Sequence, residues 1–194
     1  MIILASTSPA RQSMLRQAGL AFSIDAPQVD ERQLASLHPH WSPSDMAVEL
    51  AAAKALDVAQ RHHDATVIGA DQVLALADRS FSKPRDRAEC REHLRALRGT
   101  SHLLISGLAV AKDAQVIWRH HEVARLTMRS FSDAFLESYL DRIGEDCSSS
   151  VGGYKIEGLG IQLFERVEGD HFTILGLPLL ALLARLRELG EIAT

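Results

Sequence analysis

The chain opens with Ile2-Ile3-Leu4-Ala5-Ser6-Thr7-Ser8-Pro9-Ala10-Arg11, and this stretch decides its fold class. Four consecutive apolar residues predict a short strand. Ser8 followed by Pro9 predicts a helix start, because serine is a favoured N-cap and proline fits the first helical turn. Helical and strand patterns then alternate along the chain without a strict β-α-β rhythm. The sequence therefore predicts an α/β fold, with a mixed sheet and flanking helices.

A second informative stretch is Val67-Ile68-Gly69-Ala70-Asp71-Gln72. We expect two strands, over 65–70 and 73–76, separated by a break at Asp71-Gln72. Polar groups at strand ends of α/β proteins gather where a rigid sheet aims them into a crevice. Asp71 is therefore a candidate metal ligand or base, and a turn-forming aspartate is the alternative. A turn predicted at Asp78 leads to Lys83-Pro84, a second candidate cationic site.

Composition limits the classes of function. The 194 residues are 46% hydrophobic, which is enough for a proper core, and we treat residues 1–194 as one domain. Lys and Arg number 21 against 25 Asp and Glu, so no global basic field exists to hold a nucleic-acid polymer. An anionic ligand must therefore be met by local groups. The two cysteines, Cys90 and Cys147, lack metal-ligand spacing and are expected to be idle thiols.

No segment predicts export or membrane insertion. The apolar run at the N-terminus is too short for a signal peptide and lacks its charged flank. The stretch over 175–189 contains Pro178, Arg185, Arg187 and Glu188, so it cannot span a bilayer. The sequence predicts a cytoplasmic protein without a membrane partner.

Lys54 lies in an unusual place for a charged residue. A long helix is predicted from Ser42-Pro43 to about Arg61, after a polar loop that carries Asp30 and Glu31. Lys54 projects within the apolar stripe of this helix. It either extends its stem over the core edge or presents its ammonium to an anion in a cleft. Ser6 and Arg11, at the first helix start, either cap that helix or help to bind phosphate oxygens.

Together these segments resemble the Maf family, from Ile2 to Leu189. The motifs that carry the resemblance follow one another in this order: Leu4-Ala5-Ser6-Thr7-Ser8-Pro9 with Arg11, Val29-Asp30-Glu31, Ala53-Lys54-Ala55, Gly69-Ala70-Asp71, Lys83-Pro84, Gly158-Leu159-Gly160 and Gly176-Leu177-Pro178-Leu179.

The resemblance implies two lobes around a central cleft, a divalent cation, Mg²⁺ or Mn²⁺, and a homodimer. The implied activity is hydrolysis of a nucleoside triphosphate to the monophosphate and pyrophosphate. The matched residues give Asp71, Lys54 and Lys83 catalytic roles, and Glu31 with Asp71 the metal, with Asp30 as the alternative to Glu31. The substrate-binding set is Ser6, Arg11, Ala10, Gln72 and Glu157.

Within the family, Gln72 and Glu157 resemble the subgroup that acts on 7-methyl-GTP. A dTTP and UTP subgroup, the alternative, has Thr and Gln at these positions. Ala10 departs from the pattern, because some 7-methyl-GTP enzymes carry a tryptophan there that could stack on a cationic base. A nucleotide-binding regulator of cell division without turnover is a further alternative. The intact Asp71, Lys54 and Lys83 favour an enzyme.

Overall fold

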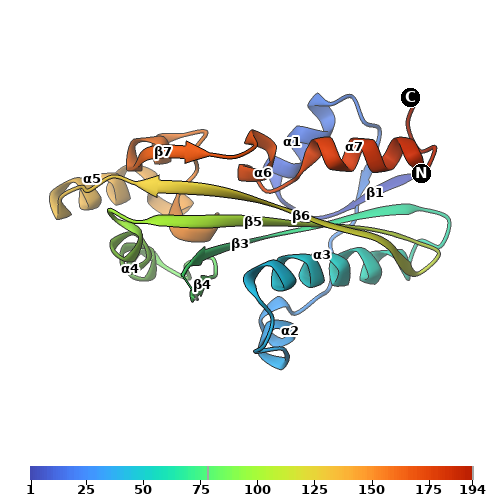
Figure 1. The fold of residues 1–194 in the computed structure, drawn as a ribbon, viewed down its shortest axis with the longest axis horizontal. Helices are drawn as coiled ribbons and strands as arrows, with labels where there is room; N and C mark the ends of the chain where they lie inside the picture. The colour runs from blue at the N-terminus through green and yellow to red at the C-terminus, as the bar shows by residue number, and fades with distance from the viewer. Residues whose placement is uncertain (78, 194) are drawn as a thin grey trace. The chain divides into compact units, whose positions relative to one another are not determined.

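A computed structural model describes residues 1–77 and 79–193, so the turn expected at Asp78 lies outside the described residues. Helices and strands alternate along the chain (Figure 1). In order they are β1 (Ile2–Ala5), α1 (Pro9–Gln17), β2 (Ser23–Ile24), α2 (Glu31–Leu37), α3 (Pro43–Ala59), β3 (Thr66–Leu76), β4 (Arg79–Phe81), α4 (Arg87–Leu97), β5 (Ser101–Lys112), β6 (Gln115–Met128), α5 (Asp133–Ile143), the 3-10 helices η1 (Gly144–Ser148), η2 (Val151–Gly153) and η3 (Leu159–Leu163), β7 (Phe164–Glu168), α6 (His171–Ile174) and α7 (Leu179–Glu188).

The strands form one mixed sheet in the order β2-β1-β3-β5-β6-β7, and β4 pairs with β3. β1 runs parallel to both β2 and β3, whereas β4 is antiparallel to β3 and β7 is antiparallel to β6. The predicted mixed α/β fold is therefore confirmed. The chain divides into two compact units, to both of which β3, β5 and β6 contribute. Unit 1 comprises Met1–Gln72, Ile105–Val123 and the chain from Asp170 onward, and unit 2 comprises Val73–Leu104 and Ala124–Gly169.

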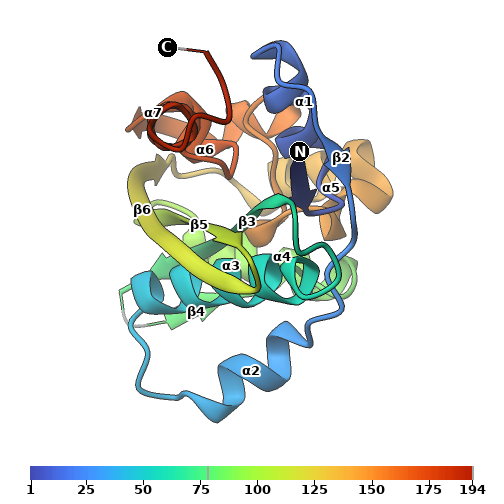
Figure 2. The ribbon, with the colours of Figure 1, turned by 90° about the vertical axis from the view of Figure 1, so that its right-hand side faces the viewer.

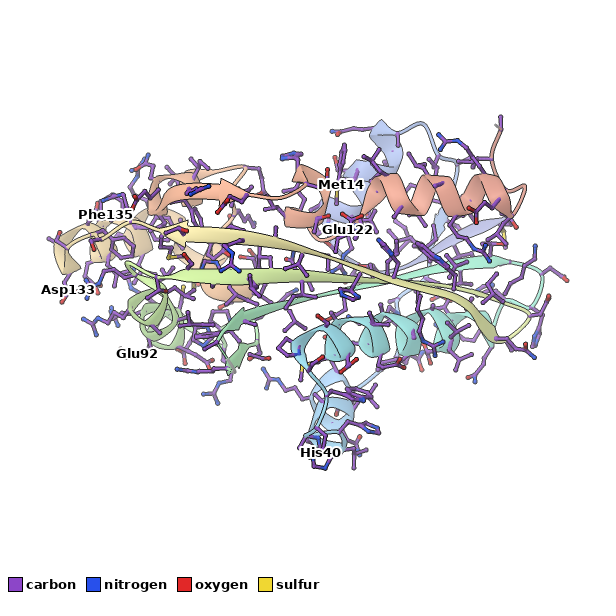
Figure 3. All side chains as sticks on the ribbon, in the orientation of Figure 1. Met14, His40, Glu92, Glu122, Asp133 and Phe135 are labelled. Atoms are coloured by element: carbon purple, nitrogen blue, oxygen red, sulfur yellow. The ribbon has the colours of Figure 1, made fainter. Side chains whose placement is uncertain are left out.

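Unit 1 has a core on each face of its strands, because successive side chains of a strand point to opposite faces. Ile2 and Leu4 of β1 pack with residues of α1 and α7 on one face, among them Met14, which is labelled in Figure 3. Ile3 and Ala5 pack on the other face against α3. Figure 2 shows these strands between α3 on one side and α1 and α7 on the other.

α3 lies unusually close to the sheet, because small residues meet on both sides of the contact. A Cβ placed on Gly69 of β3 would lie 2.1 Å from the carbonyl oxygen of Ala51, and one on Gly107 of β5 would lie 2.1 Å from that of Ala47. Such distances do not occur in real structures. The two glycines are therefore required for α3 to pack this closely against the sheet.

Two local predictions were wrong, each because a polar side chain has a partner that the sequence does not show. β3 is continuous through Asp71 and Gln72, since both polar side chains are hydrogen-bonded in place. The segment after Asp30 is not a loop but begins the helix α2. Asp30 caps that helix, accepting a hydrogen bond from the amide of Gln33.

Unit 2 packs α4 and α5 with the 3-10 helices η1 and η2. Its buried His102 shares a hydrogen bond of 2.6 Å with the hydroxyl of Tyr154. Cys90 and Cys147 are both buried and free, as expected. Burial raises the pKa of Cys90 to about 12, so this thiol stays protonated and unreactive at neutral pH. Within residues 1–77 and 79–193, no helix has the length and apolar content to cross a bilayer.

We predict that Gly69→Ala destabilises the protein by about 1–3 kcal/mol, because the added methyl group forces α3 away from β3. Thermal unfolding measures the effect. Gly158→Ala is the matched control, since a Cβ there meets nothing nearer than 3.9 Å. Equal melting temperatures for the two variants would show that the close seat of α3 is not required.

Candidate active site

Buried polar side chains gather in unit 1 where the loop after β1, helix α3 and strand β3 meet. Ser6, Lys54 and Asp71 are each at most 7% exposed. Arg11 of α1 and Glu31 of α2 complete the group through the contacts below. These five residues were all singled out from the sequence, and all five belong to unit 1.

Lys54 is the centre of the group. Its Nζ lies 2.6 Å from Oδ1 of Asp71 and 2.7 Å from Oε1 of Glu31. The lysine does not extend its stem toward solvent, because the residue is only 6% exposed. An ammonium has three donors, so two carboxylate partners leave one N–H for a further acceptor.

The close packing of α3 against β3 explains why Lys54 and Asp71 form an ion pair. Gly69 and Asp71 are two residues apart on β3 and so face the same side of the sheet. Ala51 and Lys54 are three residues apart on α3 and so lie on one helix face. The contact between Gly69 and Ala51 therefore places the next turn of α3 over Asp71.

The structure distinguishes the two neighbouring acids Asp30 and Glu31. The carboxylate of Asp30 is committed to capping α2, where Oδ1 accepts from the Gln33 amide at 2.9 Å. Glu31, in the first turn of that helix, contacts Lys54 instead, and its side chain is half exposed. Glu31 is thus the acid that shares a cation with Asp71.

Arg11 fixes the loop after β1. The last registered pair of β1 with β3 is Ala5 with Gly69, and the next carbonyl of β3, that of Ala70, accepts from Nη1 of Arg11 at 2.9 Å. The same nitrogen donates to Oγ of Ser6 at 3.3 Å, and Nε donates to the carbonyl of Gly176 at 2.8 Å. Arg11 therefore holds the loop in place by hydrogen bonds and also contributes a positive charge.

Burial controls the charges of this group. It raises the pKa of Asp71 above its ordinary value, and the neighbouring Lys54 and Arg11 oppose that rise. Burial also lowers the pKa of Arg11, opposed by Asp71 and Glu31, although a guanidinium remains charged in proteins. A buried carboxylate whose pKa is raised is a stronger base than an ordinary aspartate, which suits a proton acceptor.

Gln72 follows Asp71 on β3 and faces the opposite side of the sheet. Its Nε2 donates to the carbonyls of Thr173 at 3.2 Å and Ile174 at 3.0 Å, and to Oγ of Ser106 at 3.1 Å. Sequence reasoning missed Ser106 and Thr173. The only signal for Ser106 is a lone hydroxyl within the apolar run of β5.

In the described part of the chain, no side-chain hydrogen bond or ion pair joins the remaining predicted residues to this group. Lys83 and Glu157 belong to unit 2, and both are exposed there. Ala10 is half-buried in the first turn of α1. Their roles stay predictions.

The acidic pair fits a magnesium or manganese ion. Asp71 and Glu31 approach one ammonium closely, so both carboxylates can reach a single cation. Mg²⁺ is commonly held by one or two carboxylates together with water and substrate phosphates. In residues 1–77 and 79–193 no group of three or more His, Cys, Asp or Glu side chains is arranged to hold a metal. The fit therefore rests on two acids and on oxygens that a substrate brings.

Known proteins are similar to this sequence along nearly its whole length. The Maf family model, described as Maf-like protein, matches residues 1–189. The 7-methyl-GTP pyrophosphatase of Rhizobium meliloti (strain 1021) is 51% identical over 194 residues, which cover 99% of this chain and 98% of that protein.

The nucleoside triphosphate pyrophosphatase of Paramagnetospirillum magneticum (strain AMB-1) is 50% identical over 192 residues, 98% of this chain and 99% of that one. The 7-methyl-GTP pyrophosphatase of Mesorhizobium japonicum is 50% identical over 193 residues, 98% and 97% of the two chains. The family match and these three relatives show that the chain belongs to the Maf family.

Proposed function

We propose that this protein hydrolyses a nucleoside triphosphate to the nucleoside monophosphate and pyrophosphate. The observation that carries the proposal is the buried pair of Lys54 and Asp71, flanked by Glu31 and Arg11, in a chain whose relatives are named for this reaction. Hydrolysis of a triphosphate needs mainly positioning and charge neutralisation, and this group offers both.

Each residue of the group has a proposed role. Water attacks the α-phosphorus, the bond from that phosphorus to the bridging oxygen breaks, and pyrophosphate leaves with the electron pair. Asp71 accepts the proton of the attacking water. Lys54 donates its remaining N–H to a phosphate oxygen, and Ser6 and Arg11 form the end of the proposed phosphate-binding site.

Mg²⁺ or Mn²⁺, held by Glu31 and Asp71, would neutralise charge on the phosphates when bound. Lys83 is proposed as a further phosphate ligand. The cleft between lobes, the homodimer and the cytoplasmic location stay predictions.

7-Methyl-GTP is the proposed substrate, because two of the relatives described above carry that name. Glu157 is the proposed base reader. A guanine edge presents two adjacent donors, N1–H and the exocyclic amine, and an ionised carboxylate accepts both. The carboxylate also suits the positive charge of an N7-methylated ring. Ala10 leaves the base without an aromatic partner at that position.

The proposed function predicts the products. Incubation of the purified protein with 7-methyl-GTP, GTP, UTP or dTTP and Mg²⁺ or Mn²⁺ should release pyrophosphate and the monophosphate in equal amounts. Anion-exchange chromatography separates the products. Orthophosphate and a nucleoside diphosphate as first products would contradict the proposal.

The buried pair of Lys54 and Asp71 predicts that removing each charge affects protein stability to a different extent. Asp71→Asn should leave stability nearly unchanged, because Glu31 still pairs with Lys54, but should lower kcat roughly 10²–10⁴-fold through loss of the base. Lys54→Met should lower stability by about 3–5 kcal/mol, because it leaves a buried carboxylate without its ammonium. Chemical denaturation and steady-state kinetics measure the two effects.

The double variant Lys54→Met/Asp71→Asn is the control for the pair. It removes both charges, so it should recover much of the stability that Lys54→Met alone loses. Strictly additive losses would show that the two side chains do not interact, and near wild-type turnover by Asp71→Asn would remove Asp71 from the mechanism.

Glu157→Gln tests the base reader. A glutamine presents one donor and one acceptor, which match uracil or thymine better than guanine. We expect the ratio of kcat/KM for 7-methyl-GTP over UTP to fall by the equivalent of about 1–3 kcal/mol. Glu145→Gln, also exposed in unit 2, is the matched control. If kcat/KM falls by the same factor for all substrates, Glu157 supports its loop and does not select the base.

A further inference from the structure

Glu157, the residue proposed to read the base, lies in a short turn of unit 2. The amide of Gly158 donates to the carbonyl of Lys155 at 3.3 Å, and this bond closes a four-residue turn. Glu157 is the third residue of the turn and is exposed. An exposed side chain keeps a fixed direction only if the backbone beneath it is held in place.

The chain after the turn folds back onto Lys155. A Cβ placed on Gly160 would lie 2.4 Å from the carbonyl oxygen of Lys155 and 2.8 Å from its nitrogen, so only glycine allows this approach. Nζ of Lys155 also pairs with Asp146 of η1 at 2.9 Å, but such an exposed ion pair contributes little. The position of the turn therefore depends on what holds the backbone just before Lys155.

Tyr154, the residue before the turn, is its buried attachment. The residue is 5% exposed, and its ring packs edge-on against Phe164 with centroids 4.8 Å apart. Its hydroxyl lies 2.6 Å from Nε2 of His102 on β5. Its carbonyl accepts from Oγ of Ser150 at 2.6 Å. The side chain of Tyr154 thus connects the turn to the sheet.

Gly153 is held as well, but by its backbone. Its carbonyl accepts from the hydroxyl of Tyr139, on α5, at 3.2 Å. Its φ is 74°, and a Cβ on it would lie 2.2 Å from Sγ of Cys90 on α4. Gly153 therefore fixes the backbone against the helices, while Tyr154 is the residue that reaches β5.

His102 has a single polar partner in the described part of the chain. The residue is 1% exposed, and burial lowers its pKa to about 4, so the ring is neutral at neutral pH. Its Nδ1 is buried and meets no hydrogen-bond partner among the described residues. The bond to Tyr154 is thus the only side-chain hydrogen bond that directs this ring, and its loss would leave Nε2 unpaired.

We propose that His102 and Tyr154 are positioning residues that hold the turn of Glu157 and thereby set the preference for a guanine base. Both side chains are buried and act through the backbone of Lys155. The inference rests on the proposed function, because the turn affects selection only if Glu157 reads the base. It goes beyond that function by assigning the direction of Glu157 to a buried hydrogen bond. The proposed phosphate ligands Ser6, Arg11 and Lys54 belong to unit 1, so phosphate binding should not depend on this bond.

Tyr154→Phe is the sharpest variant, because it keeps the ring against Phe164 and removes only the hydroxyl. Hydrogen exchange should speed up at least about fivefold in the peptide containing 155–161, since the turn loses its bond to β5. Thr100→Val is the matched control. It removes a hydroxyl that donates to the carbonyl of Leu97 at 2.8 Å elsewhere in unit 2, and it should leave this peptide unchanged. Unchanged exchange in Tyr154→Phe would overturn the attachment of the turn.

Selection is measured by the binding of 7-methyl-GMP, UMP and inorganic pyrophosphate, which requires no turnover. Tyr154→Phe should raise the Kd of 7-methyl-GMP about three- to tenfold and change the Kd of UMP and of pyrophosphate less than about twofold. Thr100→Val should change none of the three, although it also removes a hydrogen bond. Equal weakening of all three ligands, or a wild-type protein that binds the two monophosphates equally well, would overturn the role in selection.

Two substitutions of His102 separate the hydrogen bond from packing. Glutamine can present an amide group to the Tyr154 hydroxyl, whereas leucine fills the space without a polar atom. His102→Gln should keep the ratio of the two monophosphate Kd values within about twofold of wild type, and His102→Leu should change it as much as Tyr154→Phe does. Equal ratios for the glutamine and leucine variants would show that packing alone holds the turn, and would overturn the role of the bond.

A double-mutant cycle tests whether Tyr154 acts through Glu157. In a Glu157→Gln background, Tyr154→Phe should change the ratio of the monophosphate Kd values less than about twofold further, because the base reader is already lost. Effects that multiply independently would overturn the coupling. A wild-type protein that releases no pyrophosphate from any nucleotide would contradict the proposed function instead. The exchange rates and monophosphate affinities would still decide whether His102 and Tyr154 hold the turn and set the preference.

Discussion

The buried ion pair between Lys54 and Asp71 is the interaction on which the rest of the site depends. Neither charge is tolerable in the interior alone, because desolvation without a partner costs several kcal/mol. Together they fix one turn of α3 over one position of β3, at a separation of 2.6 Å. The close seat of α3 on Gly69 makes that separation possible. Core packing and the geometry of the candidate site are thus consequences of the same helix position.

The charges of the group suit the proposed binding of a polyphosphate together with a metal. Lys54 and Arg11 supply two positive charges, and Asp71 and Glu31 balance them. A triphosphate therefore meets a balanced site and not a basic one. A divalent cation shared by the two acids would supply the positive charge that a triphosphate requires. The slight excess of acids in the whole chain is consistent with recognition by this local group.

β3 makes two separate sets of contacts at adjacent residues because a strand presents alternate side chains to opposite faces. Asp71 takes part in the proposed chemistry on the α3 side, while Gln72 binds the segment from Thr173 to Gly176 on the α7 side. Arg11 connects the two sides, since its guanidinium reaches Ser6, the Ala70 carbonyl and the Gly176 carbonyl. Arg11 therefore links contacts on the two faces of the strand.

The sequence by itself determined the fold class, because strand alternation and helix caps are local patterns. It also indicated the family, through motifs that follow one another in a fixed order, and it predicted most residues of the candidate site. It placed Lys54 correctly inside an apolar face but could not name its partners. The sequence predicted a break in the strand at Asp71 and Gln72, because polar residues have low strand propensity. Propensity does not include the hydrogen bonds that these side chains make in the folded protein. Only the tertiary structure showed that Glu31, and not Asp30, contacts Lys54, and that Gln72 bonds to a backbone segment about a hundred residues away. Such partners are set by packing between elements distant in the chain.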